Sequence, residues 1–205
     1  MKVSGEATLH APVERVWAAL NDPSVLVRTI PGCERLETTG PDAYRMVVTA
    51  GVASIKGSYA GEVRLSDQQQ PNSFLMTASG AGGPGTVSAE VRVVLSDAEG
   101  GSTKLAYDAD AVVGGVIAGV GQRMLVGVSK KMAGEFFRSV DDVLTGKAVE
   151  AAPGAAATEA GVFTAPSGGF GPAIGREGFR HGVLVGAAIA LAGVLVGGLL
   201  GRRRH

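Results

Sequence analysis

The chain has 205 residues, enough for one ordinary domain and an additional segment, and 45% of them are apolar, which permits a hydrophobic core. Residues 1–147 carry 14 Lys and Arg against 16 Asp and Glu, a balance that excludes the basic face with which nucleic-acid-binding domains meet phosphate. The single cysteine, Cys33, excludes an internal disulfide and a paired-cysteine metal site.

The first predicted elements are a strand and two short helices. Residues 2–10 alternate between apolar and polar side chains, as in a half-buried strand. Pro12 then opens one helix, and Pro23 opens another that extends to Arg28. Residues 1–7 lack the apolar segment of a signal peptide, so the domain is expected to stay in the cytoplasm.

Five further strands are predicted from period-two alternation. Their apolar faces comprise Tyr44, Met46 and Val48; Ile55, Tyr59, Val63 and Leu65; Phe74, Met76 and Ala78; Val87, Ala89, Val91, Val93 and Leu95; and Leu105, Tyr107, Ala109 and Ala111. Such alternation indicates an antiparallel sheet that is wet on one side and covered on the other. Cys33 precedes these strands and is expected in a loop as an idle thiol.

A long helix from about residue 116 to residue 144 is expected to cover the sheet. Its predicted buried stripe is Val120, Met124, Val128, Met132, Phe136, Val140 and Leu144. The fold class is therefore α+β, with about six strands in a curved sheet wrapped on a long C-terminal helix. This helix-grip domain spans residues 1–146.

Residues 147–181 are dominated by Ala, Gly, Pro and Ser, without a sustained period. This composition predicts a disordered, flexible linker. Phe163, Phe170 and Phe179 are scattered in it, and a docking motif for a partner is the alternative interpretation.

Residues 182–201 carry no charged side chain and predict a C-terminal transmembrane helix. At about 1.5 Å per residue this length matches the hydrocarbon core of a bilayer. Small residues recur on one face of that helix and would permit helix pairing, although glycine is common throughout the chain. They are Gly182, Gly186, Ala190, Gly193 and Gly197.

The orientation of this helix has two opposing indications. The three terminal arginines, 202–204, favour a cytoplasmic C-terminus under the positive-inside bias. A folded domain is much harder to export than a short tail, so the expected location of the domain is the cytoplasmic face of the membrane.

Several motifs resemble one known family. They are Pro12-Val13-Glu14-Arg15-Val16-Trp17, Leu20, Asp22-Pro23, Ile30-Pro31-Gly32-Cys33, Gly57-Ser58-Tyr59-Ala60-Gly61, residues 101–110, Gly114-Gly115-Val116-Ile117-Ala118, Gly121-Gln122-Arg123-Met124 and Phe136-Phe137. On these motifs the chain resembles the CoxG family, which takes its name from carbon monoxide dehydrogenase, within the START-like (SRPBCC) superfamily.

This resemblance implies a non-catalytic accessory protein that recruits a molybdenum hydroxylase of the carbon monoxide dehydrogenase type to the cytoplasmic membrane. It also implies that the domain binds a quinone or similar apolar lipid for electron transfer to the respiratory chain. No covalent cofactor is expected; the ligand would be a bound menaquinone or another quinone.

The residues themselves favour binding over catalysis. No catalytic residue and no metal ligand is predicted, because the strand parity places Asp108 and Asp110 on the wet face and the three histidines lie far apart in sequence. Small inward residues, adaptable methionines and two tyrosine hydroxyls suit an apolar ligand. The predicted ligand-binding residues are Tyr59, Phe74, Met76, Val91, Tyr107, Val120, Met124, Val128, Met132 and Phe136.

Two other functions stay open at this point. A START-like cyclase or hydratase would need an inward-facing acid or base, which the strand parity does not supply. A pure membrane tether would bind no ligand in its cavity.

Overall fold

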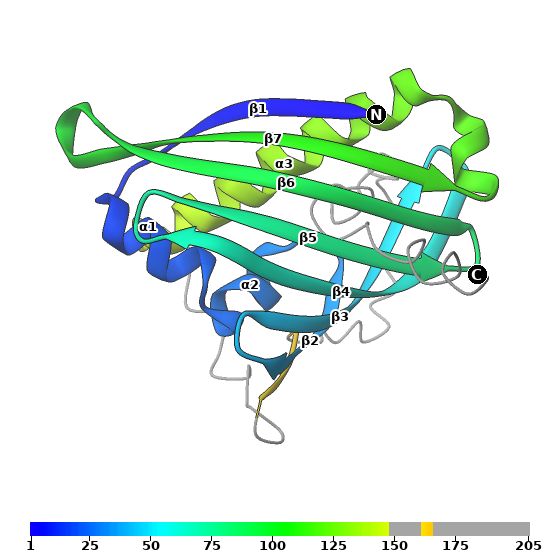
Figure 1. The fold of residues 1–205 in the computed structure, drawn as a ribbon, viewed down its shortest axis with the longest axis horizontal. Coiled ribbons are helices and arrows are strands. Elements are labelled where there is room, and N and C mark those ends of the chain that lie inside the picture. The colour runs from blue at the N-terminus through cyan, green and yellow to red at the C-terminus, as the bar shows by residue number, and fades with distance from the viewer. Residues whose placement is uncertain (148–160, 166–205) are drawn as a thin grey trace, which may run out of the picture.

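The computed structural model describes residues 1–147 and 161–165, in which a curved sheet surrounds a long helix (Figure 1). The strands are β1 (Lys2–Leu9), β2 (Cys33–Gly40), β3 (Ala43–Val52), β4 (Ile55–Gln69), β5 (Ser73–Gly82), β6 (Gly85–Ala98), β7 (Ser102–Gly114) and β8 (Val162–Thr164). The helices are α1 (Val13–Leu20), α2 (Pro23–Thr29) and α3 (Gln122–Leu144), with 3₁₀ turns η1 (Glu99–Gly101) and η2 (Val116–Val120).

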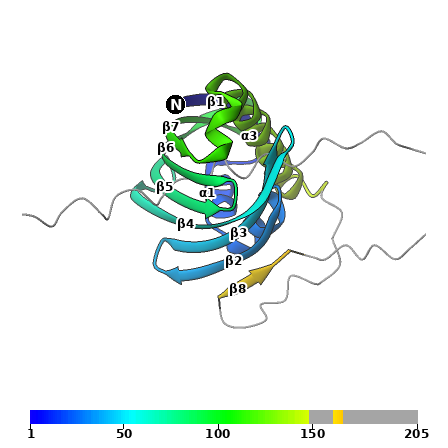
Figure 2. The same cartoon turned by 90° about the vertical axis from the view of Figure 1, so that its right-hand side faces the viewer.

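One sheet contains all eight described strands, in the order β1-β7-β6-β5-β4-β3-β2-β8. Each neighbouring pair is antiparallel, and β2 to β7 follow one another as a meander. Figure 2 shows the sheet curling so that α3 lies along its concave side. The predicted α+β arrangement of a curved antiparallel sheet on a long C-terminal helix is confirmed.

The predicted alternation also matches the burial of the strands. In β6, for example, Val87, Ala89 and Val91 are buried, whereas Glu90 and Arg92 are exposed. Alternate side chains of a strand point to opposite faces, so a single inward face follows from the pattern. The concave face of β6 is therefore apolar.

The prediction of about six strands was too low, because two strands at one edge carry little periodic signal. The segment Cys33–Gly40 forms β2, and its inward residues include only Cys33 and Leu36 as large buried side chains. Cys33 thus begins a strand and does not lie in a loop. Within the predicted linker, Val162–Thr164 form β8 against β2, with Phe163 opposite Leu36.

The long helix begins later than predicted. Residues 116–120 form the separate turn η2, and Gly121 has a φ of 92°, which breaks the helical path before α3. The predicted stripe was also wrong at its N-terminal end. Each strict four-residue step advances about 40° beyond a full turn of the helix. Over several steps such a stripe therefore rotates away from the buried face.

The buried face of α3 mixes steps of three and four. It consists of Leu125, Ser129, Met132, Ala133, Phe136, Phe137, Val140 and Leu144. This face packs on the sheet, and contacts from α1 and the first strand hold its C-terminal half. The Arg15 guanidinium donates to the Leu144 carbonyl at 3.1 Å, and the His10 amide donates to the Asp141 carboxylate at 2.6 Å.

The two short helices close one end of the concave side. In α1, Val16 and Trp17 are buried, and Trp17 meets Phe74 of β5 edge-to-face at 5.6 Å between ring centroids. In α2, the Asp22 carboxylate accepts the Ser24 N–H and caps the helix at its start. Both helices therefore stand as a wall between the sheet and α3.

The predicted transmembrane helix over residues 182–201 lies outside the described residues, as does most of the predicted linker. Among the residues that the structure describes, no helix has the length and hydropathy needed to span a membrane.

Candidate ligand-binding site

An apolar pocket lies between α1, α2, the C-terminal half of α3 and the concave face of the sheet. Its lining residues are Leu20, Leu26, Ile30, Leu36, Tyr44, Met46, Val63, Leu65, Phe74, Met76, Val93, Leu105, Phe136 and Phe137. Four of these are half-buried and form its rim, namely Leu26, Ile30, Tyr44 and Met76. The rim thus joins α2 to strands β3 and β5.

The chemistry of the pocket suits a ligand with few polar atoms. Tyr44 is the one lining residue with a hydroxyl. Burial, with smaller contributions from the carboxylates of Asp42 and Asp22, raises the pKa of Tyr44 above its ordinary value. The phenol therefore stays neutral at physiological pH and can donate one hydrogen bond to a ligand oxygen.

The pocket is small, with an interior space of about 70 Å³. A cavity of ~150 Å³ lined by aliphatic and aromatic side chains is large enough for benzene. A quinone ring therefore needs the pocket to open. The flexible side chains of Met46 and Met76 and the half-buried Leu26 of α2 are the parts of the lining best suited to move.

The structure separates the ten predicted ligand-binding residues into four groups. Phe74, Met76 and Phe136 line the pocket. Four others are buried in the interior without lining it, namely Tyr59, Val91, Tyr107 and Met132. Val120 and Val128 are half-buried against the core. Met124 is 48% exposed, because the predicted stripe had rotated away from the sheet at that point.

Sequence reasoning missed the contribution of α1 and α2. Leu20, Leu26 and Ile30 come from this region, and Phe137 is the neighbour of a predicted residue. The apolar spacing of the first helix was visible in the sequence, but its docking beside Phe74 was not. Phe137 would have been found by a 3.6-residue period in place of a strict four-residue step.

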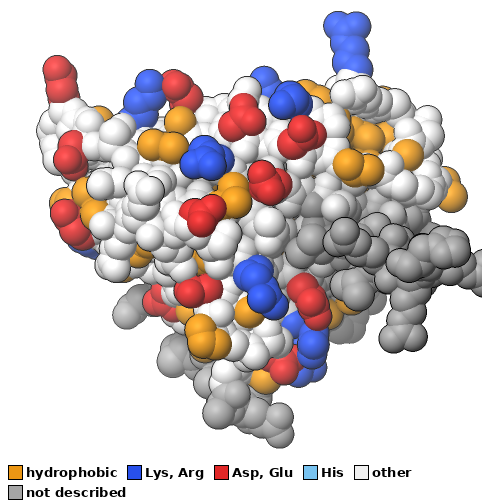
Figure 3. Space-filling model, in the orientation of Figure 1, with side chains coloured by type: hydrophobic (Ala, Val, Ile, Leu, Met, Phe, Trp, Pro, Cys, Tyr) orange, Lys and Arg blue, Asp and Glu red, His pale blue; other side chains and the backbone are white. Residues whose placement is uncertain are grey.

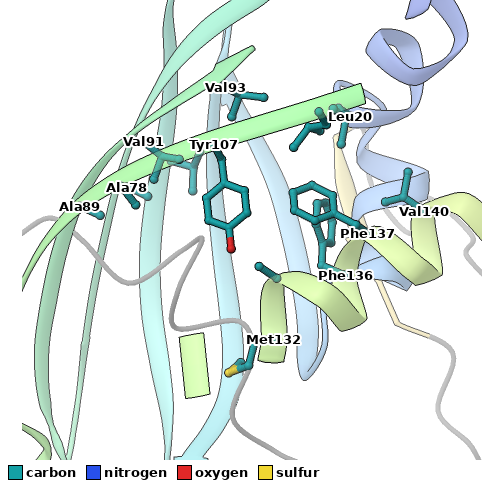
Figure 4. Close-up of a cluster of buried hydrophobic side chains, with 14 of the residues drawn as sticks. Leu20, Ala78, Ala89, Val91, Val93, Tyr107, Met132, Phe136, Phe137 and Val140 are labelled. Atoms are coloured by element: carbon teal, nitrogen blue, oxygen red, sulfur yellow. The ribbon is translucent and has the colours of Figure 1, made fainter. Parts of the chain in front are cut away.

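The two predicted hydroxyls lie in different surroundings. The Tyr59 hydroxyl is enclosed and has no hydrogen-bond partner among the described residues. The Tyr107 ring packs against Phe137 at 5.8 Å between centroids and covers Gly5, where a Cβ would lie 2.6 Å from the phenol oxygen. Figure 4 shows Tyr107 and Phe137 side by side on the inner side of the sheet. Burial raises the pKa of both tyrosines.

The predicted alanines form a continuous strip on the concave face. Ala78, Ala89 and Ala111 pair directly across β5, β6 and β7, with Ala109 beside them. All four are buried, and none lines the apolar pocket. This pocket lies over larger side chains, and the expectation that the small residues bound a ligand cavity stays a prediction.

Groups able to act as acid, base or nucleophile are scarce inside the described structure. No Asp, Glu, His, Lys or Arg is buried there, and the buried polar residues are Thr29, Ser79, Thr103 and Ser129. Burial raises the pKa of the Cys33 thiol to about 11, so this thiol is unreactive at neutral pH. No three metal-ligating side chains gather among the described residues.

The one histidine–carboxylate pair on the described surface is structural. His10 Nδ1 lies 2.9 Å from Asp141 Oδ2, and the His10 side chain is exposed. This pair joins the end of β1 to α3. Partial burial raises the pKa of Asp141, but the two hydrogen bonds from His10 and nearby positive charge outweigh it, so the pKa lies below its ordinary value.

Solved structures similar to this chain share its fold. A conserved protein from Geobacillus kaustophilus is 36% identical, with 72% of this chain and 97% of that chain covered and a TM-score of 0.69. A START superfamily protein from Mycobacterium smegmatis is 14% identical, with coverage of 71% and 98% and a TM-score of 0.57. The Zhui aromatase/cyclase from a Streptomyces species is 15% identical, with coverage of 74% and 97% and a TM-score of 0.56.

The last two similarities show the START-like fold alone. A comparison with curated proteins found no match. The family model CoxG, whose description is that of a carbon monoxide dehydrogenase subunit, matches residues 5–145, nearly the whole described domain. The chain therefore belongs to the CoxG family of START-like proteins.

Proposed function

We propose that this chain is a membrane-attached accessory protein of a molybdenum hydroxylase of the carbon monoxide dehydrogenase type, and that it binds a quinone or similar apolar lipid. The family description supports the association with such an enzyme. The observation that supports a bound apolar ligand is the pocket between α1, α2, α3 and the sheet, which has an apolar lining and one neutral hydroxyl.

Binding fits this interior better than catalysis does. A cyclase or hydratase has to move a proton, and the described interior contains no buried acid, base or cation for that step. A quinone has an apolar tail and two oxygens, which match an apolar lining and a single donor at Tyr44. The ring would enter past the rim as Leu26 and Met76 move aside.

The test is mass spectrometry of an organic extract. Residues 1–165, which contain every described element, are expressed in a quinone-producing bacterium and purified without detergent. The expected result is quinone at close to one molecule per chain. An empty extract, together with failure to take up added quinone, would leave a tether without a ligand.

A matched pair of variants locates the ligand. Met76→Trp places an indole ring in the pocket, whereas Val94→Trp places the same ring at an exposed position on the outer face of the sheet. Loss of quinone in the first variant alone supports the pocket. Equal quinone content in both variants would place the ligand elsewhere.

A further inference from the structure

Exposed apolar side chains gather at one end of the molecule. Four large ones are exposed among the described residues: Val94, Val112, Val116 and Met124. Val112 and Val116 are 70% and 67% exposed, and with Met124 they lie on three consecutive elements, the end of β7, η2 and the start of α3. Single exposed apolar residues are ordinary, but a gathered set marks an interaction site. Figure 3 shows apolar side chains together at this end, at the upper right.

The two ends of the sheet differ in charge. The end that holds η2 is formed by residues 50–57, 81–86 and 112–124, and we name it the apolar end. These segments contain no Asp or Glu and two basic residues, Lys56 and Arg123, both exposed.

The opposite end, the acidic end, contains the β2–β3, β4–β5 and β6–β7 turns (residues 40–43, 66–72 and 96–102). These turns contain no Lys or Arg. Their acidic residues are Asp42, Asp67, Asp97 and Glu99, and all four are exposed. Figure 1 shows the β6–β7 turn at the far left and η2 at the far right, so the acidic end and the apolar end lie at opposite ends of the sheet.

The local structure holds the apolar side chains outward. Ile117 is fully buried, and its N–H donates to the Pro84 carbonyl at 3.0 Å. Gly115 presses on the β5–β6 turn so closely that a Cβ there would lie 2.6 Å from Gly85 Cα. With Ile117 fixed inward, its neighbour Val116 has to point to solvent. The exposure is therefore a property of the packed structure.

A groove of about 240 Å³ lies beside these side chains. It runs between Met1, the end of β7 and the start of α3, and Gln122 is its one lining residue with a polar side chain. The groove extends the surface around Val112 to the exposed Ala118, and the buried Leu125 forms part of its lining. An apolar binding partner can thus contact more of this end than the side chains of Val112, Val116 and Met124.

We propose that the apolar end docks on an anionic lipid bilayer, with Val112, Val116 and Met124 below the headgroups. This inference rests on the proposed membrane attachment and assigns the surface that makes contact. Lys56 and Arg123 would lie at headgroup level, where basic side chains are attracted to anionic lipid. The acidic end would face away from the membrane, since the anionic headgroups repel its carboxylates.

The test measures the depth of a label in vesicles with the full chain. Because Cys33 is buried and unreactive, a single introduced cysteine can carry an environment-sensitive fluorophore. Val116→Cys labels the apolar end, and Val94→Cys is the matched control, an exposed valine on the outer face of the sheet. The vesicles contain phosphatidylcholine and phosphatidylglycerol, with a nitroxide on part of the acyl chains.

We expect the nitroxide to quench the label at position 116 at least twofold more than the label at position 94. Adding Val112→Asp and Met124→Asp to the first variant should reduce its quenching to the control level. Equal quenching at 116 and 94 in protein that floats with the vesicles would overturn the docking surface alone. A label shielded from aqueous iodide yet not quenched by the nitroxide would also overturn it and indicate a protein partner.

Protein that fails to float with the vesicles would overturn both the docking surface and the proposed membrane attachment. The quinone content of the purified chain is measured separately and does not enter any of these outcomes. Failure of the ligand proposal and failure of this inference are therefore distinguishable.

Discussion

The two halves of the interior differ although the same strands build both. One half, the pocket half, lies between α1, α2 and the C-terminal part of α3 and is lined by large residues such as Leu65, Phe74 and Phe137. The other, the alanine half, contains Ala78, Ala89 and Ala111 in register. The pocket lies in the half with large side chains.

This difference leads us to expect that the two halves respond differently to a change in side-chain size. A facing helix can approach short side chains until it makes contact, because protein interiors pack as densely as organic crystals. Large side chains and intervening helices keep the layers apart, and space remains where their shapes do not fill the gap. The following predictions test this contrast, from the largest expected effect to the smallest.

Shortening a residue in the pocket half should have the largest effect. Leu105 is fully buried and lines the pocket. Leu105→Ala should lower the free energy of unfolding by about 2–5 kcal/mol, since it removes buried methyl groups and enlarges an existing space. Urea unfolding measures this loss. A loss below about 1 kcal/mol would mean that the layers close around the deletion and that this half is not held open.

Enlarging a residue in the alanine half should also destabilise the domain. Ala89→Leu should cost about 1–3 kcal/mol of unfolding free energy if the strip is already in close contact. Val94→Leu, on the exposed face of the same strand, should stay within about 0.5 kcal/mol of the parent. Stabilisation by Ala89→Leu would contradict the contrast, because it would reveal unfilled space over the alanines.

The enclosed hydroxyl of Tyr59 predicts a smaller change of opposite sign. A buried hydroxyl without a partner costs about 1–3 kcal/mol in lost hydration, so Tyr59→Phe should stabilise the ligand-free domain by about 1 kcal/mol. Tyr107→Phe is the control, with little change expected. Thermal unfolding of both variants checks the pair. Destabilisation by Tyr59→Phe would show that the hydroxyl binds a water or ligand group.

The His10–Asp141 pair predicts a pH effect at the pocket half, where it holds α3 to β1. The pKa of Asp141 is lower in the folded than in the unfolded state, so its contribution is present above the ordinary pKa of about 4 and is lost as the pH falls through the folded pKa. Asp141→Asn should lower stability at pH 6 and flatten its decline below pH 4. Parallel curves of stability against pH for both proteins would refute this role.

Much of the fold follows from local pattern in the sequence. The alternation in residues 87–95 and 105–111 decides which side chains face inward, because the two-residue period of a strand leaves no other choice. The beginnings of the two short helices, at Pro12 and Pro23, also follow from the local sequence. Strand β2 was missed because the charged Glu34, Arg35 and Glu37 surround its buried Leu36 and interrupt the alternation. Strand β8 was missed because a segment of three residues is too short to show a period.

The site depended on tertiary structure. The sequence determined an apolar concave face, a long covering helix and the family, and it identified Phe74, Met76 and Phe136 as interior residues. Only the packed chain decided that α1 and α2 would wall the pocket, that Met124 would turn to solvent, and that η2 would hold Val116 outward. The physical reason is that a period determines the direction of a side chain, whereas a cavity or a surface patch depends on which elements meet in space.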